Sequence, residues 1–120
     1  MKKLLIIEDD DNNLLLISRL LEVAGYQCMT ARTGEEGLEM VSECRPDAVL
    51  LDIGLPGIQG TEVLKRLRAS EFNGDLPIIA VTSSAMPGDR EYLLAQGCTA
   101  YIEKPIDPES FIAQLKAIIG

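Results

Sequence analysis

The sequence predicts an α/β fold in which five parallel strands form an open, doubly wound sheet with helices on both faces. Five short apolar runs alternate along the chain with five amphipathic segments of helix length, which is the pattern of repeated strand–helix units. Three of the five runs are almost wholly apolar, as expected of parallel strands that helices cover on both faces. The short connections between the units favour right-handed crossovers within one sheet.

The first unit consists of an expected strand at residues 4–7 and an expected helix at residues 12–24. The helix contains four consecutive aliphatic residues, 14–17, which cannot all face the sheet because neighbours are about 100° apart around a helix. Leu15 falls in the middle of the polar side of this helix. We therefore expect the side chain of Leu15 to be exposed.

The second unit has an expected strand at residues 27–31 and an expected helix at residues 34–44. Gly25 lies where the first helix should stop, because glycine readily adopts the backbone conformation that ends a helix. Thr33 and Glu36 fit a capping box, in which each side chain accepts a hydrogen bond from the other residue's free backbone amide. The second helix is therefore expected to begin directly after Thr33.

The third unit pairs an apolar strand at residues 48–51 with a helix at residues 61–70, and the fourth pairs a strand at residues 78–82 with a helix at residues 87–96. Gly97 follows the fourth helix and marks its end. Both strands are short apolar runs of the kind that lie inside parallel sheets.

The fifth unit has a strand at residues 100–102 and a helix at residues 108–119. Asp107 offers an acceptor for the free amides at the start of this helix, and Pro108 suits its first position. The chain contains no linker and no second zone of composition. We therefore expect one domain over residues 1–120.

Composition limits the class of protein. The formal charge of −8 disfavours direct nucleic-acid binding and suits a protein that binds a hard cation or meets basic partner surfaces. No apolar stretch approaches the length of a membrane span, and the apolar run near the first residue is too short for a signal peptide. We expect a soluble, cytoplasmic protein without membrane insertion, in which Cys28, Cys44 and Cys98 are reduced, buried thiols.

Polar residues follow four of the expected strands, at the edge where ligands of such sheets bind. In order, they are Glu8, Asp9, Asp10, Asp11, Asp52, Thr82, Ser83, Ser84, Glu103 and Lys104. The acidic run after the first strand is also typical of a solvated loop that precedes a helix. Asp52 is more informative, because an acid directly behind a wholly apolar strand is costly to bury unless it is paired or bound to a metal.

The residue types at this edge favour Mg²⁺ over other metals. Carboxylates in a chain without histidine suit a hard ion that prefers oxygen, and Mg²⁺ accepts few protein ligands plus waters and a phosphate. A lysine and a hydroxyl group beside the ion would complete a site for a phosphoryl group.

Four motifs at these strand ends carry a resemblance to a known family. They are Ile6-Ile7-Glu8-Asp9-Asp10, Leu51-Asp52-Ile53-Gly54-Leu55-Pro56-Gly57, Val81-Thr82-Ser83 and Tyr101-Ile102-Glu103-Lys104-Pro105. Over essentially its whole length, the chain resembles the receiver domain of two-component response regulators, the CheY-like family. It is most similar in these motifs to stand-alone receivers of the DivK type and to receivers of hybrid kinases. The resemblance implies a flavodoxin-like (βα)5 sheet with strand order 2-1-3-4-5.

The resemblance also implies a role for each residue of the motifs. Asp52 is expected to accept a phosphoryl group from a phosphohistidine of a histidine kinase or histidine phosphotransfer protein. The expected Mg²⁺ ligands are Asp9, Asp52, the main-chain carbonyl of Gly54 and, directly or through water, Glu8. Lys104 is expected to pair with Asp52 at rest and with a phosphoryl oxygen after transfer, while the hydroxyl of Thr82 binds another oxygen. The chain is therefore expected to be a phosphoacceptor rather than an enzyme. It would support its own phosphotransfer, and slow hydrolysis of the acyl phosphate would follow at the same site.

The family's switch would involve Thr82 and Tyr101. Thr82 is expected to move toward the phosphoryl group and Tyr101 to turn inward behind it. This would alter the surface made by the fourth helix, fifth strand and fifth helix, which meets a downstream protein. The alternative for Tyr101 is an ordinary half-buried tyrosine. The bond between Lys104 and Pro105 is expected to be cis, on the resemblance alone.

Two positions depart from common choices in the family. Gly54 and Ser84 stand where many members carry larger side chains, and both are expected to flank the path of the attacking water. We therefore expect an open site, in which the access of water sets the rate of dephosphorylation more than a positioned side chain does.

Leu15 is a candidate contact for the helical bundle of a kinase, since it is expected to be exposed beside the acidic edge. The chain could also be a receiver domain excised from a larger hybrid kinase or multidomain regulator. A flavodoxin-like protein that holds FMN is a third alternative, but it would need a phosphate-binding loop after the first strand, where this chain has four acids.

Overall fold

The computed structural model describes residues 2–54, 59–70, 73–83 and 88–120, and within them five strands alternate with five helices. The strands are β1 (Lys3–Ile7), β2 (Gln27–Ala31), β3 (Ala48–Asp52), β4 (Ile78–Thr82) and β5 (Ala100–Glu103). The helices are α1 (Asp11–Val23), α2 (Gly34–Cys44), α3 (Gly60–Ala69), α4 (Asp89–Ala95) and α5 (Pro108–Ile119). Every element expected from the sequence is present, with small shifts at its ends.

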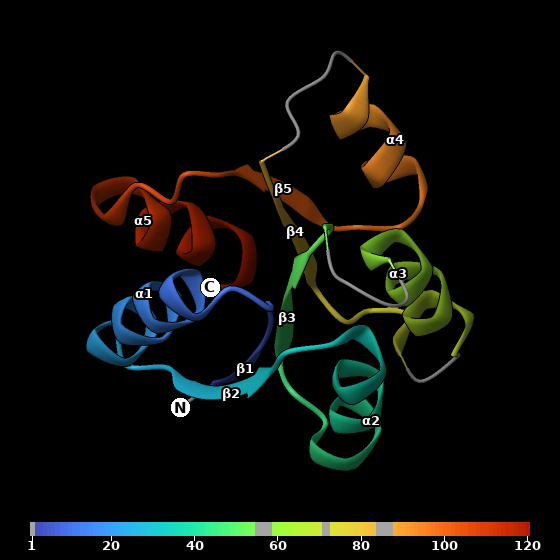
Figure 1. Ribbon diagram of the computed structural model, residues 1–120, viewed down its shortest axis with the longest axis horizontal. Coiled ribbons are helices and arrows are strands. Elements are labelled where there is room, and N and C mark those ends of the chain that lie inside the picture. Colours follow the sequence, from blue (N-terminus) through green and yellow to red (C-terminus); the bar gives the residue numbers. More distant parts are fainter. Residues whose placement is uncertain (1, 55–58, 71–72, 84–87) are drawn as a thin grey trace.

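The five strands form one parallel sheet in the order β2-β1-β3-β4-β5, which confirms the expected topology. Helices α1 and α5 cover one face of the sheet, and α2, α3 and α4 cover the other (Figure 1). The chain therefore leaves β1 toward one edge of the sheet and returns to β3 on the other side of β1. Such a reversal of strand order opens a crevice beyond the carboxyl ends of β1 and β3.

Two aliphatic layers hold the helices to the sheet, because alternate residues of a strand point to opposite faces. On the side of α1 and α5, Leu4 and Ile6 of β1 pack in one buried cluster that contains Phe111. On the other side, Leu5 and Ile7 pack in a second cluster. All four strand residues are at most 1% exposed, so β1 is buried between the two layers.

The expected starts of α2 and α5 are confirmed by hydrogen bonds to their cap residues, of which the capping box at Thr33 contributes one of its two expected bonds. The hydroxyl of Thr33 accepts a hydrogen bond from the amide of Glu36 at 3.1 Å. The carboxylate of Asp107 accepts one from the amide of Glu109 at 3.1 Å, directly before Pro108 at the start of α5. Each cap satisfies an amide that has no partner within its own helix.

Three further expectations have clear outcomes. Leu15 is 55% exposed, as expected. The three cysteines are free thiols, but only Cys98 is buried; Cys28 and Cys44 are half-buried, because they lie on the edge strand and at the end of α2. Within the described parts of the chain, no helix has both the length and the apolar character of a membrane span.

Candidate functional site

The carboxyl ends of β1, β3, β4 and β5 place the expected polar residues along one rim of the sheet. The sequence predicted that Asp52 follows the third strand. In the structure Asp52 is instead the last residue of β3, because it still pairs with Val81 of β4. Thr82 pairs with Glu103 of β5, and the amide of Lys104 donates a hydrogen bond to the carbonyl of Thr82 at 2.8 Å. Parallel register therefore brings the ends of these strands side by side.

Three carboxylates gather at this rim. Glu8, Asp9 and Asp52 each present an oxygen, and the three oxygens lie within 4.8 Å of one another. Glu8 is 2% exposed and Asp52 is 7% exposed, whereas Asp9 is open to solvent. Three carboxylates with access from one side form a donor set that suits a hard divalent cation.

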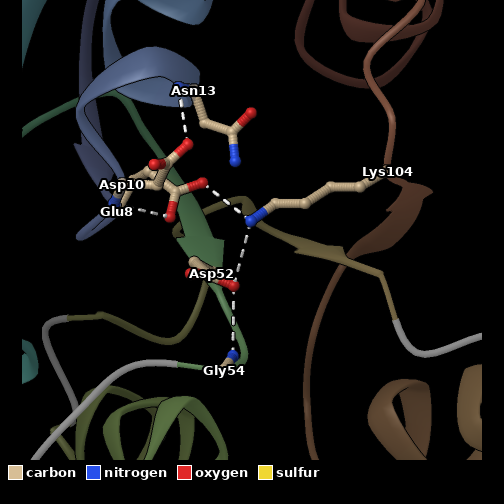
Figure 2. A network of polar contacts seen from close by, with 6 residues as sticks. All are labelled: Glu8, Asp10, Asn13, Asp52, Gly54 and Lys104. Carbon is tan, nitrogen blue, oxygen red and sulfur yellow. Dashed lines mark hydrogen bonds and ion pairs between the residues drawn. The ribbon is translucent and has the colours of Figure 1, made fainter.

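The ammonium group of Lys104 lies between the two buried acids (Figure 2). Its Nζ is 2.8 Å from Oε1 of Glu8 and 3.4 Å from Oδ1 of Asp52. Burial acts to lower the pKa of Lys104, but the hydrogen bond to Glu8 and the negative charge of Asp52 outweigh it and raise that pKa. Lys104 is therefore a fixed positive charge at the rim.

Glu8 has a strongly perturbed carboxyl group. Burial and a hydrogen bond with Asp52 raise the pKa of Glu8 to about 7, although Lys104 acts in the opposite direction. Two adjacent acids disfavour each other's ionised form, and one cation only partly relieves the repulsion. The carboxylates at the rim therefore carry more negative charge than Lys104 alone can balance, which favours a bound cation.

Backbone amides hold the acids in place. The amide of Gly54 donates to Oδ1 of Asp52 at 3.1 Å, and the amide of Asp10 donates a longer bond of 3.4 Å to Oε2 of Glu8 (Figure 2). Asp10 caps α1 by accepting a hydrogen bond from the amide of Asn13 at 3.1 Å, and Asp11 pairs with Arg32. Asp10 and Asp11 therefore stabilise the start of α1, which is the role that the sequence offered as the alternative to metal binding for this acidic run.

Gly60 packs against the backbone at the end of β3, a contact that was not predicted from the sequence. A Cβ atom at this position would lie 2.5 Å from the Cα of Ile53 and 2.7 Å from the carbonyl oxygen of Asp52. The first residue of α3 therefore packs directly on the backbone that carries Asp52. A glycine at a helix start is too common for the sequence to reveal this contact.

The expected switch residues lie beside the rim. Thr82 is 4% exposed, Tyr101 is half-buried on β5, and the Lys104-Pro105 bond is cis as expected. Thr82 also borders a cavity of about 150 Å³ between α3 and α4, whose lining includes Ile53 and Tyr92. Ser84 lies outside the described residues.

Fold and site together define a class of protein: an α/β domain with a carboxylate cluster, a lysine and a threonine at the switch point of its sheet. A sequence model of the response regulator receiver domain matches residues 4–116. The chain belongs to the response regulator receiver family. Its members are phosphoacceptors of two-component signalling, which confirms the expected class of function, phosphorylation-based signalling by a receiver domain.

Known proteins similar to this chain agree with that assignment. The polar-differentiation response regulators DivK of Brucella anthropi and Brucella ovis are each 43% identical to it over 105 residues, which cover 88% of this chain and 85% of the relative. The chemotaxis response regulator CheY4 of Vibrio cholerae has a similar structure, with a TM-score of 0.93 at 29% identity and 98% of each chain covered.

A second similar structure bears on the metal. The receiver domain of a sensor histidine kinase from Pseudomonas aeruginosa has a TM-score of 0.90 at 32% identity, with 99% of this chain and 98% of that chain covered. It contains a magnesium ion coordinated in its active site cleft. Receiver domains bind Mg²⁺ at their acidic site, and they interact with histidine kinases or phosphotransfer proteins and with downstream targets.

Proposed function

We propose that Asp52 accepts a phosphoryl group from a phosphohistidine of a histidine kinase or histidine phosphotransfer protein. One observation carries this proposal: Asp52 is a buried carboxylate that shares the rim with two other acids and lies 3.4 Å from the ammonium group of Lys104. A strand end, a backbone amide and a lysine hold the carboxylate in a fixed position. Such positioning is the main requirement of phosphoryl transfer.

The acidic cluster fits Mg²⁺, because its donors are hard carboxylate oxygens that converge within 4.8 Å. We assign Asp9, Asp52, the main-chain carbonyl of Gly54 and, directly or through water, Glu8 as the residues that would hold the ion. The bound ion would supply positive charge that offsets the charge of the phosphoryl oxygens.

In the proposed transfer, a carboxylate oxygen of Asp52 attacks the phosphorus atom in line with the bond to the donor imidazole. The bond between phosphorus and the imidazole nitrogen breaks as the bond to Asp52 forms, and its electron pair stays on the ring. Because the other ring nitrogen carries a proton at that moment, the donor leaves as neutral imidazole. Lys104 then pairs with one phosphoryl oxygen, and the hydroxyl of Thr82 donates a hydrogen bond to another. Water later hydrolyses the acyl phosphate, so the chain supports its own slow dephosphorylation.

The phosphoryl group would shift a two-state equilibrium near the rim. Thr82 would move toward the new oxygens and Tyr101 would turn inward, which would change the surface made by α4, β5 and α5. The short α4 supports this proposal, because Leu93 is its buried residue while Tyr92 and Leu94 are exposed. A downstream protein that distinguishes the two surfaces would receive the signal.

Leu15 is the proposed contact for the helical bundle of the kinase. It is 55% exposed on α1, whose first turn begins at the rim beside Asp10. The receiver domain is proposed to span residues 1–120, since the ten elements lie between Lys3 and Ile119. We further propose a cytoplasmic location.

Phosphotransfer profiling tests the proposal. The protein would be mixed with each phosphorylated histidine kinase of the source organism, and uptake of labelled phosphate would be followed over time with Mg²⁺ and with a chelator. We expect the wild-type protein to take up phosphate rapidly from one cognate kinase. This uptake should be lost in the Asp52→Asn variant and in the presence of the chelator. Uptake by Asp52→Asn at the wild-type rate would overturn the assignment.

A further inference from the structure

Arg68, in the last turn of α3, bonds to the segments that precede β4 and β5. Its Nε donates a hydrogen bond to the carbonyl of Gly97 at 2.7 Å, and one of its Nη atoms donates to the carbonyl of Asn73 at 2.7 Å. The other Nη atom donates to Oγ1 of Thr99 at 3.3 Å. One half-buried arginine therefore connects α3 to the turn between α4 and β5, two elements of the proposed output surface.

Gly97 allows the end of α4 to approach this side chain closely. It has a φ of 114°, a conformation that suits glycine at the end of a helix. A Cβ atom on Gly97 would lie 2.9 Å from Cγ of Arg68. The amides of Gly97 and Cys98 donate hydrogen bonds to the carbonyls of Leu94 and Leu93, each at 3.1 Å. The turn that ends α4 is therefore packed against the stem of Arg68 as well as bonded to its guanidinium group.

Thr99 ties the same turn to β4. Its amide donates a hydrogen bond to the carbonyl of Ile78 at 2.7 Å, and its Oγ1 accepts one from the amide of Ile78 at 3.0 Å. Ile78 is the buried first residue of β4. Because Oγ1 of Thr99 also accepts from Arg68, the ends of α3 and α4 and the start of β4 form one hydrogen-bonded unit. A cation is favourable at this place, since the carboxyl ends of both helices meet there.

The start of α4 is held differently. Its N-cap residue is Gly88, which has a φ of 91° and no side chain to accept hydrogen bonds from the first amides of the helix. The buried residue of this seven-residue helix is Leu93, in its second half. The cavity of about 150 Å³ that Thr82 borders lies beside Asp89, Tyr92 and Leu93. Helix α4 therefore has one firmly bonded end and, near Thr82, a glycine cap with space beside it.

We propose that Arg68 anchors the C-terminal end of α4, so that α4 turns about this end when the rim takes up a phosphoryl group. The inference rests on the switch proposed for Thr82, and it identifies the fixed point of that movement. Displacement would be greatest at Gly88 and smallest at Gly97. Because α4 is short and one end is fixed, a small shift beside Thr82 becomes a rotation of the whole helix. Arg68 touches no reacting group and is therefore a positioning residue.

Hydrogen exchange in the unphosphorylated protein tests the anchor. In Arg68→Met, the amides of Gly97, Cys98 and Thr99 are expected to exchange at least about tenfold faster relative to the amides of β1. The reason is that opening the turn would no longer break the bonds to the guanidinium group. Comparison with β1 separates this local effect from a loss of global stability, which would speed exchange in both places.

Two further variants control this measurement. Arg66→Met removes an exposed arginine of the same helix, which pairs with Glu62, and should leave the exchange ratio unchanged. Arg68→Lys keeps the charge but replaces a fork of donors by one ammonium group, so it should raise the ratio by a smaller factor of about three. This milder variant decides the question if Arg68→Met does not fold.

NMR of the ¹⁵N-labelled protein, before and after phosphorylation by a small-molecule donor with Mg²⁺, tests the rotation. In the wild-type protein, changes in chemical shift are expected to be large over residues 88–92 and at least about threefold smaller over residues 94–99. In Arg68→Met, the changes over residues 94–99 should become as large as those over residues 88–92, whereas Arg66→Met should keep the wild-type pattern. A purely structural role of Arg68 would lower stability without altering this pattern.

Two results would overturn the inference. An unchanged exchange ratio in Arg68→Met and Arg68→Lys would show that the guanidinium group does not hold the turn. Equal changes in chemical shift at the two ends of α4 in the wild-type protein would exclude a rotation about one end, as would the wild-type pattern in Arg68→Met. Failure of the wild-type protein to take up phosphate would instead refute the role proposed for Asp52, and the exchange ratio, which needs no phosphate, would still decide whether Arg68 anchors α4.

Discussion

Lys104 and Glu8 form the shorter of the two ion pairs at the rim, with 2.8 Å between Nζ and Oε1, although they come from opposite ends of the chain. The lysine is 3.4 Å from Asp52, so it serves both acids at once. A buried carboxylate beside a second carboxylate depends on such a cation. The pair therefore links the first and last strand ends into one site.

Removing the lysine should destabilise the metal-free protein. Lys104→Met is expected to lower the free energy of unfolding by about 1–3 kcal/mol, because Glu8 and Asp52 would lose their cation. In a Glu8→Gln background the same change should cost at least about 1 kcal/mol less, because one of the two charges is already gone. Urea unfolding of the four proteins with a chelator measures this coupling, and strictly additive effects would contradict it.

Gly60 should not tolerate a side chain. Gly60→Ala is expected to cost about 1–3 kcal/mol in the free energy of unfolding and to slow phosphorylation of Asp52, because its Cβ would meet the backbone of Ile53 and Asp52. Gly54→Ala is the matched control: among the described residues its Cβ would have one near neighbour, Oδ1 of Asp52 at 3.8 Å, and the change should cost less than about 0.5 kcal/mol. Equal unfolding midpoints for the two variants would refute the close contact.

Gly54 should control how long the acyl phosphate survives. Among the described residues, Oδ1 of Asp52 is the nearest atom to a Cβ placed on Gly54, at 3.8 Å, so a side chain there would lie next to the carboxylate and in the expected path of water. Gly54→Asn is expected to lengthen the lifetime by a factor of roughly three to ten, which corresponds to about 0.7–1.4 kcal/mol in the barrier. Loss of labelled phosphate from the purified phosphoprotein gives the lifetime, and an unchanged value would count against an open site.

Leu15 should affect transfer from the kinase and not the chemistry at Asp52. Leu15→Asp is expected to slow transfer from the cognate kinase by roughly fivefold or more, because a charge would replace an apolar contact. Phosphorylation by a small-molecule donor should stay unchanged. Val23→Asp, also on α1 and 90% exposed, is the control and should leave kinase transfer intact. A normal rate for Leu15→Asp would remove Leu15 from the kinase contact.

Tyr101 should be needed for the output and not for phosphorylation. Tyr101→Ala is expected to take up phosphate normally yet to lose most of the increase in affinity for the downstream protein, at least about tenfold. Tyr101→Phe keeps the ring and should retain more of the response. Affinities measured with and without phosphorylation decide the question, and a full response in Tyr101→Ala would make Tyr101 an ordinary half-buried tyrosine.

The sequence by itself determined the elements and the residues at the strand ends. Apolar runs such as residues 78–82 are too short for helices and too apolar for exposed strands, so their pattern has one interpretation. Local caps at Thr33 and Asp107 fixed where helices begin, because capping depends only on neighbouring residues. The strand order came from the motifs and their resemblance to receiver domains.

Only the tertiary structure decided which of these residues touch. The pairing of Lys104 with Glu8 depends on β3 lying between β1 and β4, which no local pattern near either residue encodes. The raised pKa of Glu8 and the contact of Gly60 with the backbone of Asp52 have the same origin. Burial and close approach are properties of packed elements, so they appear only when distant segments are brought together.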